Sequence, residues 1–149
     1  MKKLILVALT IITILNPTQV LAQLSLTCPT QGSLTLTNQY NLATTQPAQC
    51  SFVVDNTVSN IDVTITLSEP TLNHQATTGK IDPAGTSRTA QLTYTNNSSS
   101  KTIHQNSSTT DTFSGSSTTP MAVSIQIQRP QKFFAGFYTY ELMINITSP

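Results

Sequence analysis

Two cysteines give this chain its clearest chemical signal. Cys28 and Cys50 are the only cysteines among its 149 residues, and such a pair could form a disulfide, hold a metal ion or include a reactive thiol. A metal site needs more ligands, but His74 and His104 lie far from the cysteines in sequence and in polar segments. In an exported chain two cysteines usually pair. We therefore predict a Cys28–Cys50 disulfide, no metal site and no cofactor.

Acidic residues offer the only other catalytic chemistry. An Asp/Glu pair could hydrolyse a glycoside, but nothing in the sequence brings two carboxylates together, and the chain has no tryptophan for a sugar site. Gly-rich phosphate loops, His-Glu-x-x-His and Gly-x-Ser-x-Gly are all missing. We therefore predict that the protein is not an enzyme. Its acidic residues are Asp55, Asp62, Glu69, Asp82, Asp111 and Glu141.

The start of the sequence predicts export. A basic head, Met1-Lys2-Lys3, precedes an uncharged apolar run at 4–15, and Val20-Leu21-Ala22 is a small-x-small cleavage site. This pattern is typical of a signal peptide, residues 1–22. A permanent membrane anchor is the alternative, but the run of about a dozen residues is shorter than the roughly 20 that a spanning helix needs. We expect a secreted protein in the periplasm or on the cell surface, without a membrane span after signal removal.

The charge of the remaining residues, 23–149, argues against nucleic acid as a partner. Loss of Lys2 and Lys3 leaves five basic and six acidic residues, so the formal net charge falls from +1 to −1. The five basic residues are scattered and form no stripe that could follow a phosphate backbone. The length suits one domain with its own core.

Alternating apolar and polar residues predict β-strands along this whole domain. Seven such runs are separated by turn signals, and none has a sustained helical period. This is typical of an immunoglobulin-like β-sandwich of about seven strands. Val63 and Ile65 should be buried, with Asp62, Thr64 and Thr66 exposed between them. The runs begin at Leu24, Leu34, Cys50, Ile61, Ala90, Met121 and Tyr138.

The last strand is the most apolar. Gly136 permits a turn into it, and after it one set of alternate residues is large and apolar, which predicts a long strand with one buried face. Leu142 and Ile144 should face the core, whereas Glu141 and Asn145 should not. The apolar set is Tyr138, Tyr140, Leu142, Ile144 and Ile146.

Residues 96–120 interrupt the strand pattern. They consist mostly of serine, threonine and asparagine, with Ile103 and Phe113 as isolated apolar residues. So long a polar stretch predicts either a mobile surface loop or a contact surface for a sugar or another subunit.

Three features of the sequence occur together: the two cysteines, the segment Arg88-Thr89-Ala90-Gln91-Leu92-Thr93-Tyr94, and Ala135-Gly136-Phe137-Tyr138 before the alternating C-terminal tail. In these features the sequence resembles the spore coat protein U family, which includes archaic chaperone–usher pilins. The resemblance implies a sandwich that lacks one strand and a groove formed by the last strand. A periplasmic chaperone would fill this groove first, and the next subunit, delivered at an usher, would then replace the chaperone.

The resemblance leaves two functions open. Only Leu24 and Leu26 are candidates for a donor strand, and the segment before Cys28 is too short to fill a groove. The chain would then accept a strand without donating one, as a tip or terminal subunit of a surface fibre or coat does. The alternative is a stand-alone secreted β-sandwich domain that binds carbohydrate or a host surface.

Overall fold

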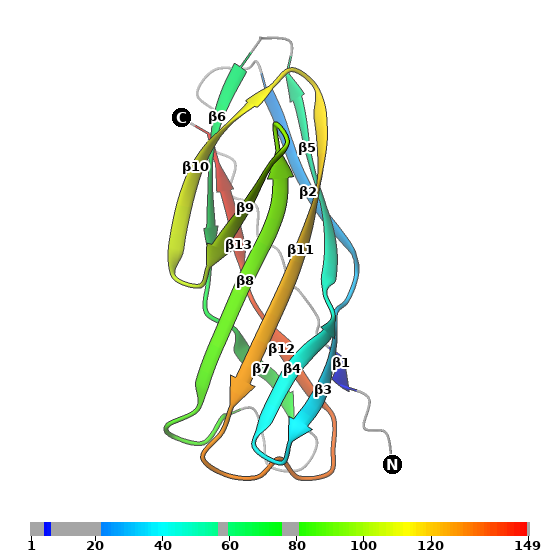
Figure 1. Cartoon of the computed structure of the whole chain (residues 1–149), viewed down its shortest axis with the longest axis vertical. Coiled ribbons are helices and arrows are strands. Elements are labelled where there is room, and N and C mark those ends of the chain that lie inside the picture. The colour runs from blue at the N-terminus through cyan, green and yellow to red at the C-terminus, as the bar shows by residue number, and fades with distance from the viewer. Residues whose placement is uncertain (1–4, 7–21, 57–59, 76–80, 149) are drawn as a thin grey trace.

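The computed structural model describes residues 5–6, 22–56, 60–75 and 81–148 (Figure 1). All the regular secondary structure in these residues is antiparallel β-strand, which confirms the predicted all-β fold. No helix in this part of the chain could span a membrane. The predicted signal peptide, residues 1–22, lies outside the described residues except for Ile5, Leu6 and Ala22.

In the larger sheet a single position can be filled by two successive strands, the second of which continues the line of the first along the long axis of the molecule. β2 and β3 form one edge, β4 and β5 lie next to them, and β11, β8 and β9 follow in that order. A short strand, β1 (Ile5–Leu6), pairs with β3. The other strands of this sheet are β2 (Ala22–Thr30), β3 (Ser33–Asn38), β4 (Asn41–Gln46), β5 (Ala48–Asn56), β8 (Ser87–Asn96), β9 (Ser99–His104) and β11 (Ser117–Gln128).

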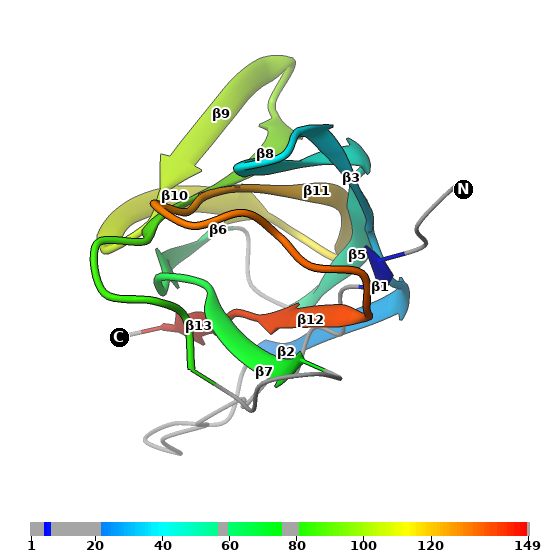
Figure 2. The ribbon, with the colours of Figure 1, turned by 90° about the horizontal axis from the view of Figure 1, so that it is seen from below.

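The facing layer consists of two small sheets placed end to end. In one, β6 pairs with β10 on one side and with β13 on the other; in the second, β7 pairs with β12. Figure 2 shows the larger sheet curling so that it faces β12 and β13. These strands are β6 (Asn60–Leu67), β7 (Thr71–Gln75), β10 (Ser107–Ser114), β12 (Tyr138–Glu141) and β13 (Ile144–Thr147).

Within the described residues the strand order is that of an immunoglobulin-like sandwich without its strand G. The complete sandwich has strands A-B-E-D in one sheet and C-F-G in the other. Here β2/β3, β4/β5, β11 and β8 take positions A, B, E and D, while β6/β7 and β12/β13 take positions C and F. In the described part of the chain no strand pairs with the far edge of β12 or β13, where strand G would lie.

The core follows the alternation in the sequence. Val63 and Ile65 are fully buried and Asp62 is exposed, as predicted, but Thr64 and Thr66 are half-buried rather than exposed. The covering of Thr64 comes from β10, where Thr110 Oγ1 lies 2.8 Å from Thr64 Oγ1.

The polar segment at 96–120 is not a long loop, so that prediction was wrong. It forms β9, β10 and the start of β11. β9 and β10 each bury one large apolar side chain, Ile103 and Phe113, while most of their serines and threonines face solvent. The Phe113 ring packs edge-on against the ring of Phe52 of β5, with 5.2 Å between the ring centres, and this contact joins the two layers.

Two neighbouring strands break at the same level of the larger sheet. β2 gives way to β3 at residues 31–32, and β4 gives way to β5 at Pro47. Gly32 is buried there, and a Cβ on it would lie 2.8 Å from the nitrogen of Ala48 and 2.9 Å from the oxygen of Gln46. Only glycine allows the two backbones to approach so closely.

Candidate functional site

The five residues predicted to line a groove place their side chains in the core. Their exposed fractions do not exceed 4%. The alternation continues through the bend at Leu142 and Met143, which separates β12 from β13. Glu141 and Asn145 lie on the other face and are half-buried. The buried residues are Tyr138, Tyr140, Leu142, Ile144 and Ile146.

The unpaired part of the last strand is therefore its backbone edge. Ser68 N donates to Met143 O at 2.9 Å, whereas Leu67 O on the other side of β6 accepts from Asn106 N at 2.7 Å. Hydrogen-bonded and non-hydrogen-bonded pairs alternate along an antiparallel ladder. The main-chain groups of Ile144 and Ile146 must then point away from β6, toward the empty position of strand G.

The edge of the larger sheet beside this position takes up an additional strand. β1 pairs antiparallel with β3, with Ile5 opposite Leu34 and Leu6 opposite Ser33, and it also lies against β12 (Figure 1). Residues that precede the predicted cleavage site thus extend the sheet at the lower end of its free edge. The space between β3 and β12 accommodates a strand in this orientation.

A buried charge cluster fixes the last strand at its start. Asp82 Oδ1 accepts hydrogen bonds from Arg129 Nε at 2.9 Å and from the Tyr140 hydroxyl at 2.9 Å, and its Oδ2 accepts from Arg88 Nε at 2.9 Å. The side chain of Asp82 has no exposed surface and that of Arg129 is 2% exposed. We call Asp82, Arg88, Arg129 and Tyr140 the Asp82 clamp.

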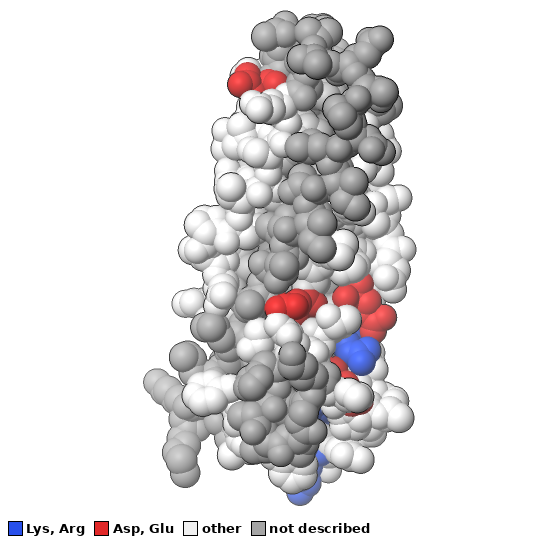
Figure 3. All heavy atoms as spheres, turned by 180° about the vertical axis from the view of Figure 1, so that it is seen from behind, with Lys and Arg blue, Asp and Glu red and all other residues white. Residues whose placement is uncertain are grey.

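The outer part of the Asp82 clamp reaches solvent through Glu69, which pairs with Arg88 at 2.9 Å. Figure 3 shows acidic side chains beside basic ones on the lower half of the rear face. Burial and the negative charge of Asp82 raise the pKa of Tyr140, so its hydroxyl remains a hydrogen-bond donor at neutral pH. The sequence predicted no role for Asp82, because its partners Arg129 and Tyr140 lie far along the chain.

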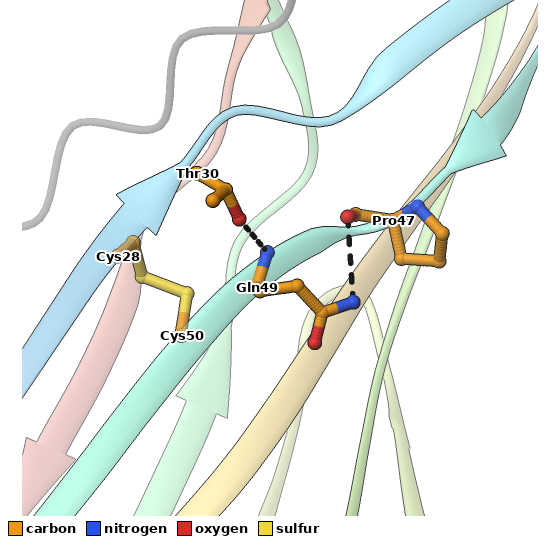
Figure 4. Close-up of a disulfide and its surroundings, with 5 residues drawn as sticks. All are labelled: Cys28, Thr30, Pro47, Gln49 and Cys50. Carbon is orange, nitrogen blue, oxygen red and sulfur yellow. Dashed lines mark hydrogen bonds between the residues drawn. A yellow bond between two sulfur atoms is a disulfide. The ribbon is translucent and has the colours of Figure 1, made fainter.

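The predicted disulfide is present. Cys28 of β2 is bonded to Cys50 of β5, and Figure 4 shows the bond crossing between these neighbouring strands. Close to it, Thr30 Oγ1 accepts a hydrogen bond from Gln49 N at 3.1 Å and continues the pairing past an irregularity in the register. A disulfide of this kind is typical of exported proteins.

Leu24 and Leu26, the only candidates for a donor strand, belong to the domain's own sheet, as the first of the predicted strand runs. They lie in β2, opposite Val54 and Phe52 of β5. Leu24 is buried and Leu26 packs against the core. Among the described residues no group of histidine, cysteine or acidic side chains is arranged to hold a metal ion.

A polar hollow of about 560 Å³ lies on the outer face of the larger sheet. Gln91 occupies its centre, with Ser124 of β11 and His104 of β9 opposite it on either side. Thr89 and Gln126 form the next row. Apart from the imidazole of His104 these side chains are neutral amides and hydroxyls, and together they present both donors and acceptors.

No protein-family model matches the chain, and a search of curated proteins found no similar sequence.

Proposed function

We propose that this protein is a secreted subunit of a surface fibre or coat, assembled by donor-strand complementation. Its partners would be a periplasmic chaperone, an usher and other pilin subunits. Each would supply, or guide in, a strand that takes the place of strand G. The chain itself would accept a strand and donate none, as a tip or terminal subunit does.

The observation that carries this proposal is the free backbone edge of β12 and β13. The inner face of the strand consists of large apolar and aromatic side chains, but among the described residues the strand pairs with neighbours on one side only. An unpaired edge of this kind attracts other strands. The natural occupant is an extended segment that alternates apolar and polar residues, because its apolar side chains would enter the space between the two layers.

Two further observations support the proposal. β1 occupies the lower part of this space as an extended strand that pairs with β3 and lies against β12. β2, which begins at the predicted cleavage site, is held within its own sheet by β5 and by the disulfide. It is therefore not free to complete another copy of the domain.

The sharpest test is amide hydrogen exchange of the exported protein, followed by NMR. In the protein alone the amides of Ile144 and Ile146 should exchange quickly. The amide of Asn145 should be protected by β6, and that of Ser68 by its hydrogen bond to Met143 O. A synthetic peptide of alternating apolar and polar residues should protect Ile144 and Ile146 strongly. The protection of Asn145 and Ser68 should change far less.

A control peptide of the same composition, with its apolar residues grouped together, should protect neither the amide of Ile144 nor that of Ile146. Protection of Ile144 and Ile146 before any peptide is added, in a stable monomer, would mean that the edge is already satisfied. The assembly function would then be abandoned.

The polar hollow favours a second candidate function, a stand-alone domain that binds a neutral carbohydrate. Hydroxyl-rich ligands pair well with amide, hydroxyl and imidazole groups such as those of Gln91, Ser124 and His104. Binding to immobilised neutral glycans that is lost in Gln91→Ala, together with failure of the peptide experiment, would favour this function. Equal glycan binding by Gln91→Ala would exclude the hollow.

A further inference from the structure

One loop carries two large aromatic side chains that are more than half exposed to solvent. Residues 129–137, which we call the aromatic loop, join β11 to β12 at the lower end of the molecule (Figure 1). Phe134 is 58% exposed and Phe137 is 61% exposed, whereas Phe133 between Arg129 and Tyr138 is buried. Single exposed apolar residues are common, but two phenylalanines three positions apart form a patch.

The aromatic loop is held firmly by the fold. Arg129 N donates to Tyr40 O at 2.9 Å and Phe133 N donates to Gln39 O at 2.8 Å, both at the β3–β4 turn. The Arg129 guanidinium lies 4.3 Å from the ring centre of Phe133 and 4.8 Å from that of Tyr138.

Further bonds brace the loop from within and from the Asp82 clamp. The Tyr138 hydroxyl donates to Phe134 O at 3.1 Å, and Arg129 is the ion-pair partner of Asp82. The exposure of the two phenylalanines is therefore not a consequence of a flexible loop.

The same Asp82 clamp presents another apolar side chain. Ile81, next to Asp82, is 84% exposed. Of the four large apolar side chains exposed in the described part of the chain, three lie on the two segments that the Asp82 clamp joins. The fourth, Met143, lies at the bend between β12 and β13.

The exposed charge of the aromatic loop is that of Lys132. Arg129 is buried and paired with Asp82, and residues 129–137 contain no aspartate or glutamate. On the rear face in Figure 3 basic side chains reach the lower end of the molecule, while the acidic ones stop above it. Exposed aromatic rings beside a lysine suit the headgroup region of an anionic lipid bilayer, where rings enter and the ammonium group stays among phosphates.

We propose that the aromatic loop docks this protein on an anionic lipid surface, with Phe134 and Phe137 inserted and Lys132 among the headgroups. The loop sits at one end of an elongated molecule (Figure 1), so it can reach a bilayer while the sides of the sandwich stay free. This function does not depend on strand acceptance.

Vesicle binding tests the proposal directly. The exported protein should co-sediment with vesicles of equimolar phosphatidylcholine and phosphatidylglycerol, and less with phosphatidylcholine alone. The double variant Phe134→Ser/Phe137→Ser should lose about tenfold or more of this binding, and Lys132→Gln should lose only the preference for anionic vesicles. Met143→Ser is the matched control and should bind normally.

A fluorescence experiment locates the contact independently of affinity. The chain has no tryptophan, so Phe134→Trp introduces a single reporter whose emission should shift to the blue when anionic vesicles are added. Met143→Trp should not shift. Unchanged binding by the double serine variant, an equal loss in Met143→Ser, or self-association that depends on the aromatic loop without vesicle binding would overturn the proposal.

Discussion

The Asp82 clamp should contribute more to stability than any exposed ion pair of the protein. In Asp82→Asn the side chain keeps its shape, but Arg129 loses its carboxylate partner while remaining 2% exposed. Removing one member of a buried ion pair costs about 3–5 kcal/mol because the other charge stays buried without compensation. Typical domains unfold with about 5–15 kcal/mol, so this change would remove about a fifth or more of the stability.

Urea denaturation followed by far-UV circular dichroism measures this loss without adding ions that would screen the pair. Glu69→Gln is the matched control. It removes another carboxylate of the same network, but one whose side chain is 43% exposed, and exposed pairs contribute about 0–1 kcal/mol. A loss below about 1 kcal/mol in Asp82→Asn, equal to that of Glu69→Gln, would refute the reasoning.

A second variant separates lost charge balance from lost packing. Asp82→Asn/Arg129→Met removes both buried charges, so most of the stability lost in Asp82→Asn should return. Arg88 can then be hydrated, because its side chain is already 26% exposed. A double variant as unstable as the single one would mean that the hydrogen bonds of the cluster, rather than its charge balance, matter.

Three other variants test local features. Replacing Cys28 and Cys50 by alanine should lower the free energy of unfolding by about 2–5 kcal/mol in urea titrations; no loss would mean that strand pairing alone constrains β2. Gly32→Ala should lower the free energy of unfolding by about 1–3 kcal/mol, because its Cβ would meet the backbone of the neighbouring strand. Gly115→Asn, in open space at φ 61°, should change the free energy of unfolding little in the same titrations. Burial and the charge of Asp111 raise the pKa of Tyr94 from 10.0 to about 12. Tyr94 therefore ionises at lower pH in the unfolded chain than in the folded one, and stability should fall as pH rises through this range. Tyr94→Phe should make that fall smaller in urea titrations repeated at several pH values.

The strands predicted correctly from the sequence are those whose own residues show which face is buried. Apolar residues alternate with polar ones along most of β6 and β11, and one face of each is buried beyond its half-buried first position, Ile61 and Ser117. The pairing of Cys28 with Cys50 could also be predicted, because the sequence has only two cysteines and its predicted signal peptide implies an oxidising compartment.

The strands that the sequence analysis missed depend on their neighbours. β9 and β10 each have one fully buried apolar residue, so neither has a periodic pattern to detect. Their turns were the available signal, because Asn97 and Ser98 both have positive φ, as two-residue hairpin turns require. Asp82 was missed for a related reason, since a turn sequence gives no indication that residues 47 and 58 positions away will bury it.

The last strand packs its side chains into the core, whereas its backbone edge is the proposed acceptor site, and this limits what side-chain substitutions can reveal. A charge at Leu142 or Ile144 should abolish peptide capture, but both side chains lie in the core, so the same change would unfold the domain. The proposed acceptor site consists instead of the main-chain groups of Ile144 and Ile146, which no side-chain replacement removes cleanly. Residue-resolved exchange of those amides separates strand acceptance from folding, because the neighbouring amide of Asn145 reports on the fold in the same experiment.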